Sequence, residues 1–285
     1  AFPWKDNSLH IFRPDRNAAR MKRSLEGLKM PPFPADKFIY GVTETVRRNK
    51  ELGFFPKYMQ EWEKDDFVSG HSIYIRPFSY SEPAIGLGLS MFPWVVIINT
   101  PVGAYFAPGN AKAVTTKKIR AFPGGTGWIK CDANYVIPIL AKKEAEASGF
   151  MEAIFLDAYE HTYIEEGSSC NFFVRLNNGA LVTPELGDTV LPGISRESII
   201  TLAQDMGVPT EERRISIEEA MEEGTEVFVT GTAAGVSYIE SITHNGRTKE
   251  FAGGKPGELT LALRKKLKGI QYGVEEDIHN WMSTV

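Results

Sequence analysis

Apolar residues in the first third of the chain alternate between strand-like and helix-like spacing. Residues 9–12 form a short apolar run, and residues 18–28 and 38–46 each carry apolar side chains three or four positions apart. Residues 72–75 and 95–98 then predict core strands. This order of elements predicts an α+β unit.

The longest nearly unbroken apolar run extends from Met91 to Ile98 and contains Pro93. A helix needs about 20 apolar residues to cross a bilayer, and this run is far shorter. We therefore interpret it as a buried strand and predict no membrane span.

Apolar periodicity disappears between residues 106 and 127, where prolines and glycines interrupt a polar stretch. Such a stretch is typical of a connection between domains. We predict a small α+β domain over residues 1–108, an interdomain linker over 109–125, and a larger domain over 126–285.

The larger domain is predicted to begin with a helix over residues 134–148, which short strands and further helices follow. Ser195 is placed to cap one helix, and Ser216 with Glu219 forms a capping box for the next. The spacing is not that of regular βαβ units, and no dinucleotide-binding or phosphate-binding glycine motif occurs. These features favour mixed sheets over a doubly wound fold.

The composition of the 285 residues is that of a globular protein, with 42% hydrophobic and 24% charged residues. The net charge of −4 provides no basic surface for nucleic acid or an anionic membrane. Cys131 and Cys170 are too few for a disulfide scaffold, and five scattered histidines predict no metal site. We expect a reducing compartment, the cytoplasm. Because the sequence opens at Ala1 without Met, we expect further residues upstream.

The segment GGTGWIKCDANY, residues 124–135, contains one lysine, Lys130, which lies shortly before the helix predicted over 134–148. Most lysines are solvated surface charges. The alternative is a Schiff-base lysine, whose amine must be partly desolvated so that it loses its proton. Taken alone, the segment leaves both interpretations open.

The segment YIEEGSSCNFF, residues 163–173, places Glu165 and Glu166 side by side in a strand. Neighbours in a strand face opposite sides, so we expect one carboxylate to point to solvent and the other inward. A buried carboxylate requires a cationic or hydrogen-bonding partner, and a protonated ring nitrogen of a ligand would be one.

Two short turns, LPGIS at residues 191–195 and TGTAA at residues 230–234, follow or precede regular elements. Helix N-termini and glycine-rich turns expose backbone N–H groups that suit a phosphate or carboxylate. Either turn alone could simply end an element, and the order of all four segments is the stronger observation.

These four segments, with the tail Gln271-Tyr272-Gly273, Asp277 and Trp281, resemble the branched-chain amino acid aminotransferases, most closely their eukaryotic-type branch. The resemblance implies fold type IV, a mixed α/β architecture with a small α+β domain and a larger domain whose mixed sheet forms a barrel-like core. It also implies the cofactor pyridoxal 5'-phosphate (PLP) and a homodimer.

Site residues are implied by the same resemblance. Lys130 would form the Schiff base and move the proton, Tyr135 would bind the phenolic oxygen, and Glu166 would face the pyridine nitrogen. The remaining cofactor contacts would come from Arg20, Leu191, Ile194, Ser195 and Thr232. The substrate contacts would come from Tyr74, Arg76, Tyr105, Ala233 and Ala234. The two tyrosines, 74 and 105, could instead be core aromatics, and Arg76 a structural ion-pair member.

The chain departs from the family pattern in several places. Many relatives have two glycines where this chain has Asp132 and Ala133. Ala234 and Ser237 stand where some mammalian relatives have a redox-sensitive cysteine pair, so no redox switch is expected. Small-domain strands and a pocket segment that family members carry before the position of Ala1 have no counterpart here.

The implied reaction is transfer of the amino group of leucine, isoleucine or valine to 2-oxoglutarate. Other fold type IV enzymes are the alternative, namely D-amino acid or amine transaminases and aminodeoxychorismate lyase, since fold alone does not separate them. A catalytically impaired homologue is a third interpretation. A mitochondrial or plastid matrix would replace the cytoplasm if a transit peptide precedes Ala1.

Overall fold

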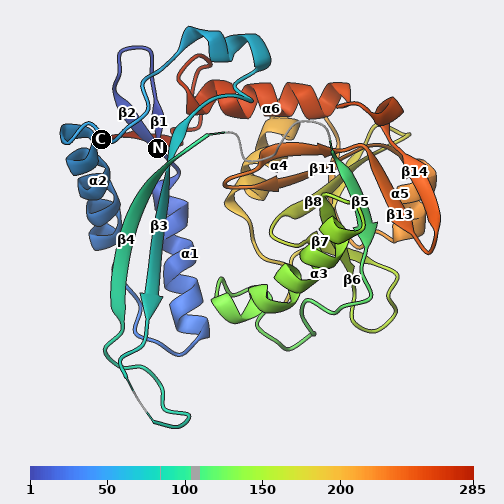
Figure 1. Ribbon diagram of the computed structural model, residues 1–285, viewed down its shortest axis with the longest axis horizontal. Helices are drawn as coiled ribbons and strands as arrows, with labels where there is room; N and C mark the ends of the chain where they lie inside the picture. The colour runs from blue at the N-terminus through green and yellow to red at the C-terminus, as the bar shows by residue number, and fades with distance from the viewer. Residues whose placement is uncertain (84, 104–109) are drawn as a thin grey trace. The chain divides into compact units, whose positions relative to one another are not determined.

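The computed structural model describes residues 1–83, 85–103 and 110–285 (Figure 1). Two compact units divide the chain, and the first combines Ala1–Tyr105 with Lys268–Val285. The second comprises Phe106–Leu267. This division differs from the predicted domains, because residues 268–285 belong with the first unit rather than with the larger one.

The first unit contains both helices and the strands predicted from the apolar spacing, together with two short strands that the spacing did not show. Its elements are β1 (Phe2–Pro3), β2 (Leu9–Phe12), α1 (Pro14–Gly27), α2 (Ala35–Glu51), a 3-10 turn (Gln60–Asp65), β3 (Ser72–Tyr80), β4 (Trp94–Val102) and β15 (Met282–Thr284).

Helix α2 packs against α1 and against the antiparallel pair β3 and β4. Its buried side chains are Phe38, Val42 and Val46, the stripe that the helical spacing predicted. Strand β15 pairs with β2, and Tyr272 is fully buried beside Phe67, with ring centroids 4.5 Å apart. These contacts explain why residues 268–285 belong to this unit.

The prediction of a buried strand over residues 91–98 is wrong. Strand β4 begins only at Trp94, and none of its nine residues is fully buried. Met91, Phe92 and Trp94 have exposed fractions of 59%, 80% and 61%. Within the described residues the strand pairs with β3 alone, and helix α2 packs against both strands.

The second unit contains most of the regular structure. Its elements are β5 (Lys112–Thr115), a 3-10 turn (Asp132–Tyr135), α3 (Val136–Ala147), β6 (Glu152–Leu156), β7 (Ile164–Gly167), β8 (Asn171–Leu176), β9 (Leu181–Thr183), α4 (Ile194–Asp205), β10 (Thr210–Glu212), α5 (Ile217–Glu223), β11 (Gly224–Gly231), β12 (Gly235–Ile239), β13 (Ser241–His244), β14 (Arg247–Glu250), a second 3-10 turn (Ala252–Gly254) and α6 (Glu258–Gln271), which continues into the first unit.

Ten strands of the described part of the chain form one mixed sheet, in which β5 runs parallel to β6 and β13, and β9 runs parallel to β10. The remaining pairs are antiparallel, and β8 contacts β7, β9 and β11. Mixed sheets, expected from the irregular element spacing, are confirmed. Strand β5 lies inside the segment predicted as a linker, so that segment is partly sheet.

Fully buried aromatic and aliphatic side chains fill the sheet's core. Phe173 and Phe228 stack across neighbouring strands with ring centroids 5.0 Å apart. Strands β6, β7 and β8 are buried along nearly their whole length, which gives polar side chains on them a rigid and water-poor setting.

Two predicted helix caps have different outcomes. Ser216 caps α5 as expected, since its hydroxyl accepts from the N–H of Glu219 at 2.9 Å. Ser195 is not a cap: α4 begins at Ile194, and the extended residue Gly193 occupies the N-cap. Along the described ranges, no helix is long and apolar enough to cross a membrane.

Candidate active site

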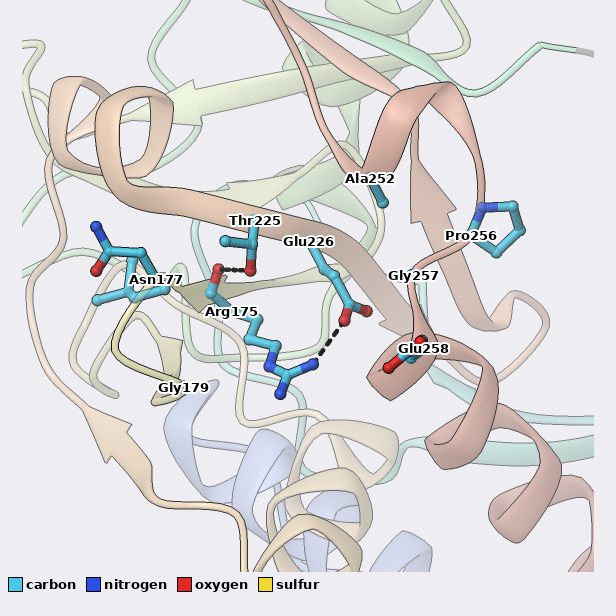
Figure 2. Close-up of a pocket in the computed structure, with 10 residues that line it drawn as sticks. Arg175, Asn177, Gly179, Thr225, Glu226, Ala252, Pro256, Gly257 and Glu258 are labelled. Carbon is cyan, nitrogen blue, oxygen red and sulfur yellow. Dashed lines mark hydrogen bonds and ion pairs between the residues drawn. The ribbon is translucent and has the colours of Figure 1, made fainter.

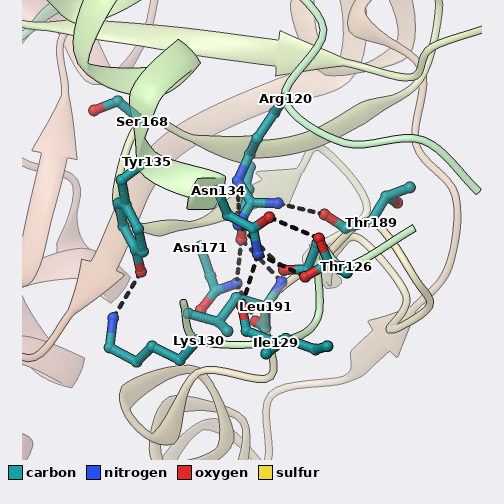
Figure 3. Close-up of polar contacts among 12 residues, drawn as sticks. Arg120, Thr126, Ile129, Lys130, Asn134, Tyr135, Ser168, Asn171, Thr189 and Leu191 are labelled. Carbon is teal, nitrogen blue, oxygen red and sulfur yellow. Dashed lines mark hydrogen bonds and ion pairs between the residues drawn. The ribbon is translucent and has the colours of Figure 1, made fainter. Parts of the chain in front are cut away.

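Lys130 and Tyr135 lie close together at the start of the segment that leads into α3 (Figure 3). The amine Nζ of Lys130 donates to the hydroxyl of Tyr135 at 2.6 Å. The side chain of Lys130 is exposed, while Tyr135 is half-buried. The five-residue separation is spanned by a short 3-10 turn, which returns the tyrosine to the lysine.

Close packing fixes the glycine-rich loop before Lys130. A Cβ atom on Gly127 would lie 2.6 Å from Cβ of Ala121 and 2.7 Å from the carbonyl oxygens of Asp188 and Thr189. Real Cβ atoms do not approach so closely, so only glycine fits here. The loop therefore lies directly against residues 188 and 189, which precede the LPGIS turn.

The side-chain amide of Asn134 forms hydrogen bonds with residues of the same loop (Figure 3). Its Nδ2 donates to the carbonyl oxygens of Thr126 and Ile129 at 2.6 and 2.8 Å, and its Oδ1 accepts from the hydroxyl of Thr126 at 2.9 Å. Two hydrogen bonds to the backbone and one to the Thr126 side chain thus hold the loop on the N-terminal side of Lys130. The motif in the sequence contains Asn134 but predicted no role for it.

Glu166 lies on β7 with its carboxylate buried in a set of donors. Oε2 accepts from the amide of Asn171 and from the backbone N–H of Leu191, each at 3.2 Å. Oε1 forms an ion pair with Nε of Arg120. The amide of Asn171 also donates to the carbonyl oxygen of Leu191 at 2.9 Å, so strand β8 and the LPGIS turn are tied together around the carboxylate.

Burial raises the pKa of Glu166 to about 7, against the opposing effects of the Arg120 guanidinium and the N–H of Leu191. The charge of Lys130 has a smaller effect in the same direction as these two, lowering the pKa of this carboxyl. A carboxyl with a pKa this far above its usual value is a common mark of a functional site.

The expectation that one of the two glutamates points to solvent is wrong. The exposed fraction is 7% for Glu165 and 3% for Glu166. Burial raises the pKa of the Glu165 carboxyl as well. Alternation along a strand does turn the two side chains apart, but both faces of β7 are covered by protein.

Arg120 was missed by the sequence analysis. Besides its ion pair with Glu166, its guanidinium donates to the carbonyl oxygens of Thr189 at 2.6 Å and Gly127 at 3.3 Å. The residue is 8% exposed. An arginine four residues before a glycine-rich loop has no sequence signature, so only the fold shows that it meets the glutamate.

Two turns were predicted to bind anionic groups. LPGIS leads into the start of helix α4, and TGTAA connects strands β11 and β12. Ile194 and Ser195 form the first turn of α4 after Gly193, where a Cβ atom would lie 2.0 Å from Oδ1 of Asn171. Thr232, Ala233 and Ala234 lie in the turn between β11 and β12, with Thr232 exposed.

The other predicted site residues belong to the first unit. Arg20 is on α1, where it donates to Oδ1 of Asn17 at 3.1 Å. Tyr74 and Arg76 are on β3, and the guanidinium of Arg76 lies 5.4 Å from the ring centroid of Tyr74. Tyr105 lies outside the described residues.

A cavity of about 470 Å³ is found elsewhere in the second unit (Figure 2). Arg175 and Glu226 line it, and none of the predicted site residues does. Among the side chains that the structure describes, no group of three histidines, cysteines or acidic residues could hold a metal ion.

Comparison with known proteins identifies the family. A family model described as amino-transferase class IV matches residues 2–242. A branched-chain-amino-acid aminotransferase from Mycobacterium tuberculosis is 39% identical, over 99% of this chain and 77% of the relative. The chain belongs to the branched-chain-amino-acid aminotransferases. This membership confirms the resemblance drawn from the four segments.

Solved structures of branched-chain aminotransferases share the fold. The enzyme of Thermoproteus uzoniensis, determined with norvaline, has a TM-score of 0.83 and 29% identity, over 99% of this chain and 86% of that one. Another branched-chain amino acid aminotransferase, determined with pyridoxamine 5'-phosphate, has a TM-score of 0.80 and 28% identity over the same shares. The class IV aminotransferase fold expected from the sequence is thereby confirmed.

Proposed function

We propose that the chain is a PLP-dependent transaminase that moves the amino group of leucine, isoleucine or valine to 2-oxoglutarate. Membership in the branched-chain aminotransferases supports the reaction class and the substrates. A related enzyme whose structure contains pyridoxamine 5'-phosphate supports the cofactor.

One observation carries the proposal: a lysine amine bonded to a tyrosine hydroxyl follows a loop that Arg120 joins to a buried carboxylate. The donor set fits PLP, because Lys130 offers an amine, Tyr135 a hydroxyl and Glu166 an acceptor for a protonated ring nitrogen. When bound, PLP supplies an electron sink for the carbanion that forms at the amino acid's α-carbon.

Lys130 would both hold the cofactor and carry the α-proton, which requires the amine to be neutral for part of the cycle. The hydroxyl of Tyr135, 2.6 Å away, orients Nζ and can exchange a proton with it. Asn134 keeps the preceding backbone in place while Nζ changes partners.

The phosphate group would be held by the second unit's helix α4 and the turn after β11. The N–H groups of Ile194 and Ser195 lie in the first turn of α4, where the helix dipole favours an anion. Thr232 is exposed on its turn, and its hydroxyl would add a hydrogen bond to the phosphate. Leu191 would cover a face of the ring, and Arg20 would add a charge to the phosphate.

The substrate contacts are proposed on the same basis. Backbone N–H groups of Ala233 and Ala234 would bind the substrate carboxylate, and Tyr74, Arg76 and Tyr105 would surround its side chain. The second unit would accordingly form the larger, cofactor-binding domain of the chain.

The test is to add PLP to the purified protein and follow its visible band, then assay leucine, D-alanine and aminodeoxychorismate side by side. We expect a band and turnover with leucine and 2-oxoglutarate. Turnover with D-alanine or aminodeoxychorismate alone would identify another fold type IV reaction. A protein that stays colourless would be a non-catalytic homologue.

We also propose that the chain forms a homodimer through the exposed side of the β3–β4 hairpin. Apolar side chains with exposed fractions of 59% or more gather on β4 and the connection before it: Ile85, Leu87, Leu89, Met91, Phe92 and Trp94. Exposed apolar patches of this kind mark interfaces. Sedimentation analysis should give twice the chain's 31.7 kDa, and Phe92→Asp should shift the mass toward the monomer.

A further inference from the structure

Arg120 meets three separate parts of the candidate active site. Its Nε pairs with the carboxylate of Glu166 on β7, its Nη1 donates to the carbonyl oxygen of Thr189 at 2.6 Å, and its Nη2 donates to that of Gly127 at 3.3 Å. The side chains of the ion pair have exposed fractions of 3% and 4%. One guanidinium therefore joins the acidic strand, the lysine loop and the segment before Leu191.

The planar fork of an arginine suits this task, because it presents five N–H donors in fixed directions and stays charged even when buried. A lysine supplies a point charge and cannot reach three acceptors in this geometry. The acceptors of Arg120 lie on Glu166 and on two backbone segments, so its action on the reaction would pass through them.

We propose that Arg120 is a positioning residue that favours the charged form of the Glu166 carboxyl and holds its orientation, and that fixes the lysine loop against residues 188–191. The proposal rests on the proposed function, since a charged Glu166 matters there as the partner of a protonated ring nitrogen. Without Arg120 the buried carboxyl would hold its proton and could no longer serve as that partner.

The charged and titratable groups that act on Glu166 come from several elements. Arg120 and Lys130 favour its ionised form, and Glu165 on the same strand opposes it. Cys170, before β8, is buried with its pKa raised, so it stays a neutral thiol near pH 7. Arg120 is thus the cation that most favours the charged form of this carboxyl, and its removal should have the largest effect.

The test compares Arg120→Gln with the wild type by infrared or ¹³C NMR titration of the glutamate carboxyls, on protein without added cofactor. Glu166→Gln identifies the signal that belongs to residue 166. An opposite charge at contact distance shifts a carboxyl pKa by about 1 to 3 units. We expect the midpoint for Glu166 to rise by this amount in the variant, and PLP affinity at pH 7.5 to fall at least about tenfold.

Arg175→Gln is the matched control, because Arg175 also pairs with a buried glutamate of the same sheet, Glu226, and lines a cavity that none of the predicted site residues lines. It should leave both the Glu166 midpoint and PLP affinity unchanged. Arg120→Gln should weaken PLP binding less in the Glu166→Gln background than in the wild type, because only the hydrogen bonds of Arg120 to Thr189 and Gly127 then remain to be lost.

An unchanged Glu166 midpoint in folded Arg120→Gln would overturn the inference. If that variant does not fold, Arg120→Lys replaces it: lysine keeps the charge but loses the fork, so a smaller rise is expected and no rise would overturn the inference. Failure of the wild type to bind PLP would instead contradict the proposed function, and the carboxyl titration would still decide the role of Arg120.

Discussion

Two buried glutamates of the second unit each pair with an arginine, and they differ in what else the glutamate binds. Glu226 on β11 pairs with Arg175 at 2.9 Å and also accepts from the N–H groups of Leu259 and Thr260 and from the Thr260 hydroxyl. Burial acts to raise its pKa, yet these donors bring the pKa below the usual value. The carboxylate of Glu226 is saturated with partners and holds the start of α6 to the sheet.

Glu166 on β7 has a charged partner but fewer hydrogen-bond donors, two of them at 3.2 Å, and its pKa is raised to about 7. Burial with so few donors makes the ionised form of the Glu166 carboxyl unfavourable, and a cationic ligand would stabilise that ionised form. Two buried Glu–Arg ion pairs can therefore differ in role, one structural and one functional. The number of further hydrogen-bond donors to the glutamate carboxylate distinguishes the two.

The largest effect is expected from Lys130→Ala, which removes the amine of the candidate active site that contains Glu166. Transaminase activity should fall by at least about a thousandfold, because both attachment and proton transfer are lost. The visible band of the bound cofactor should vanish, while circular dichroism and melting temperature should stay close to those of the wild type since Lys130 is exposed. A fully active variant would end the assignment of Lys130.

The second prediction concerns two variants, in each of which one of the two glutamates is replaced by glutamine. Glu166→Gln should reduce kcat about a hundredfold or more, because the amide cannot serve as the anionic partner of a protonated ring nitrogen. Glu226→Gln should instead lower the free energy of unfolding by about 1–3 kcal/mol, since it weakens charge-assisted hydrogen bonds to α6. Steady-state kinetics and urea titration of both variants measure the two effects. A result in which Glu226→Gln loses activity at full stability would break the distinction.

A third prediction concerns pH. Between its usual value of 4.5 and about 7, Glu166 keeps its proton in the folded protein and loses it in the unfolded chain, so folding binds more protons. The free energy of unfolding should fall as pH rises through this window, by up to about 3 kcal/mol. Glu165, whose pKa is also raised, contributes in the same direction.

Glu226 contributes with the opposite sign, because its lowered pKa gives stability that is present above the usual pKa and is lost as pH falls. Urea titrations of cofactor-free protein at several pH values should show a shallower fall between about pH 5 and 7 in Glu166→Gln. A slope equal to that of the wild type would contradict the raised pKa of Glu166.

The smallest effect is expected from Tyr135→Phe, which removes only the hydroxyl that accepts from Lys130 at 2.6 Å. A hydrogen bond to a charged group contributes about 1.5–3 kcal/mol, so kcat/KM should fall about ten- to hundredfold. The pH dependence of the rate should also move, since the hydroxyl no longer shares a proton with the amine. Asn134→Ala is a useful companion, because it loosens the loop and leaves the tyrosine in place.

The sequence predicted the local elements well where one face of an element is buried. Helix α2 with Phe38, Val42 and Val46 and the Ser216 cap of α5 follow from periodicity and capping chemistry alone. Strand β4 was misjudged because an apolar run is compatible with either a core strand or an exposed interface, and only tertiary packing decides.

The candidate site was predicted in part. Lys130 and Glu166 stand in segments whose order along the chain is distinctive, so the resemblance identified them. Arg120 and the burial of Glu165 depend on which backbone segments meet in space, and no local pattern encodes that. Residues that act through other residues are therefore the ones that sequence reasoning misses.

The position of residues 268–285 in the first unit affects the order in which the chain can fold during synthesis. Strand β15 must reach β2, and Tyr272 must reach Phe67, across most of the length of the chain. The second unit is continuous in sequence and leaves the ribosome before this segment does. The first unit therefore waits with an incomplete aromatic core, and apolar side chains that Tyr272 and β15 later cover stay exposed during that interval.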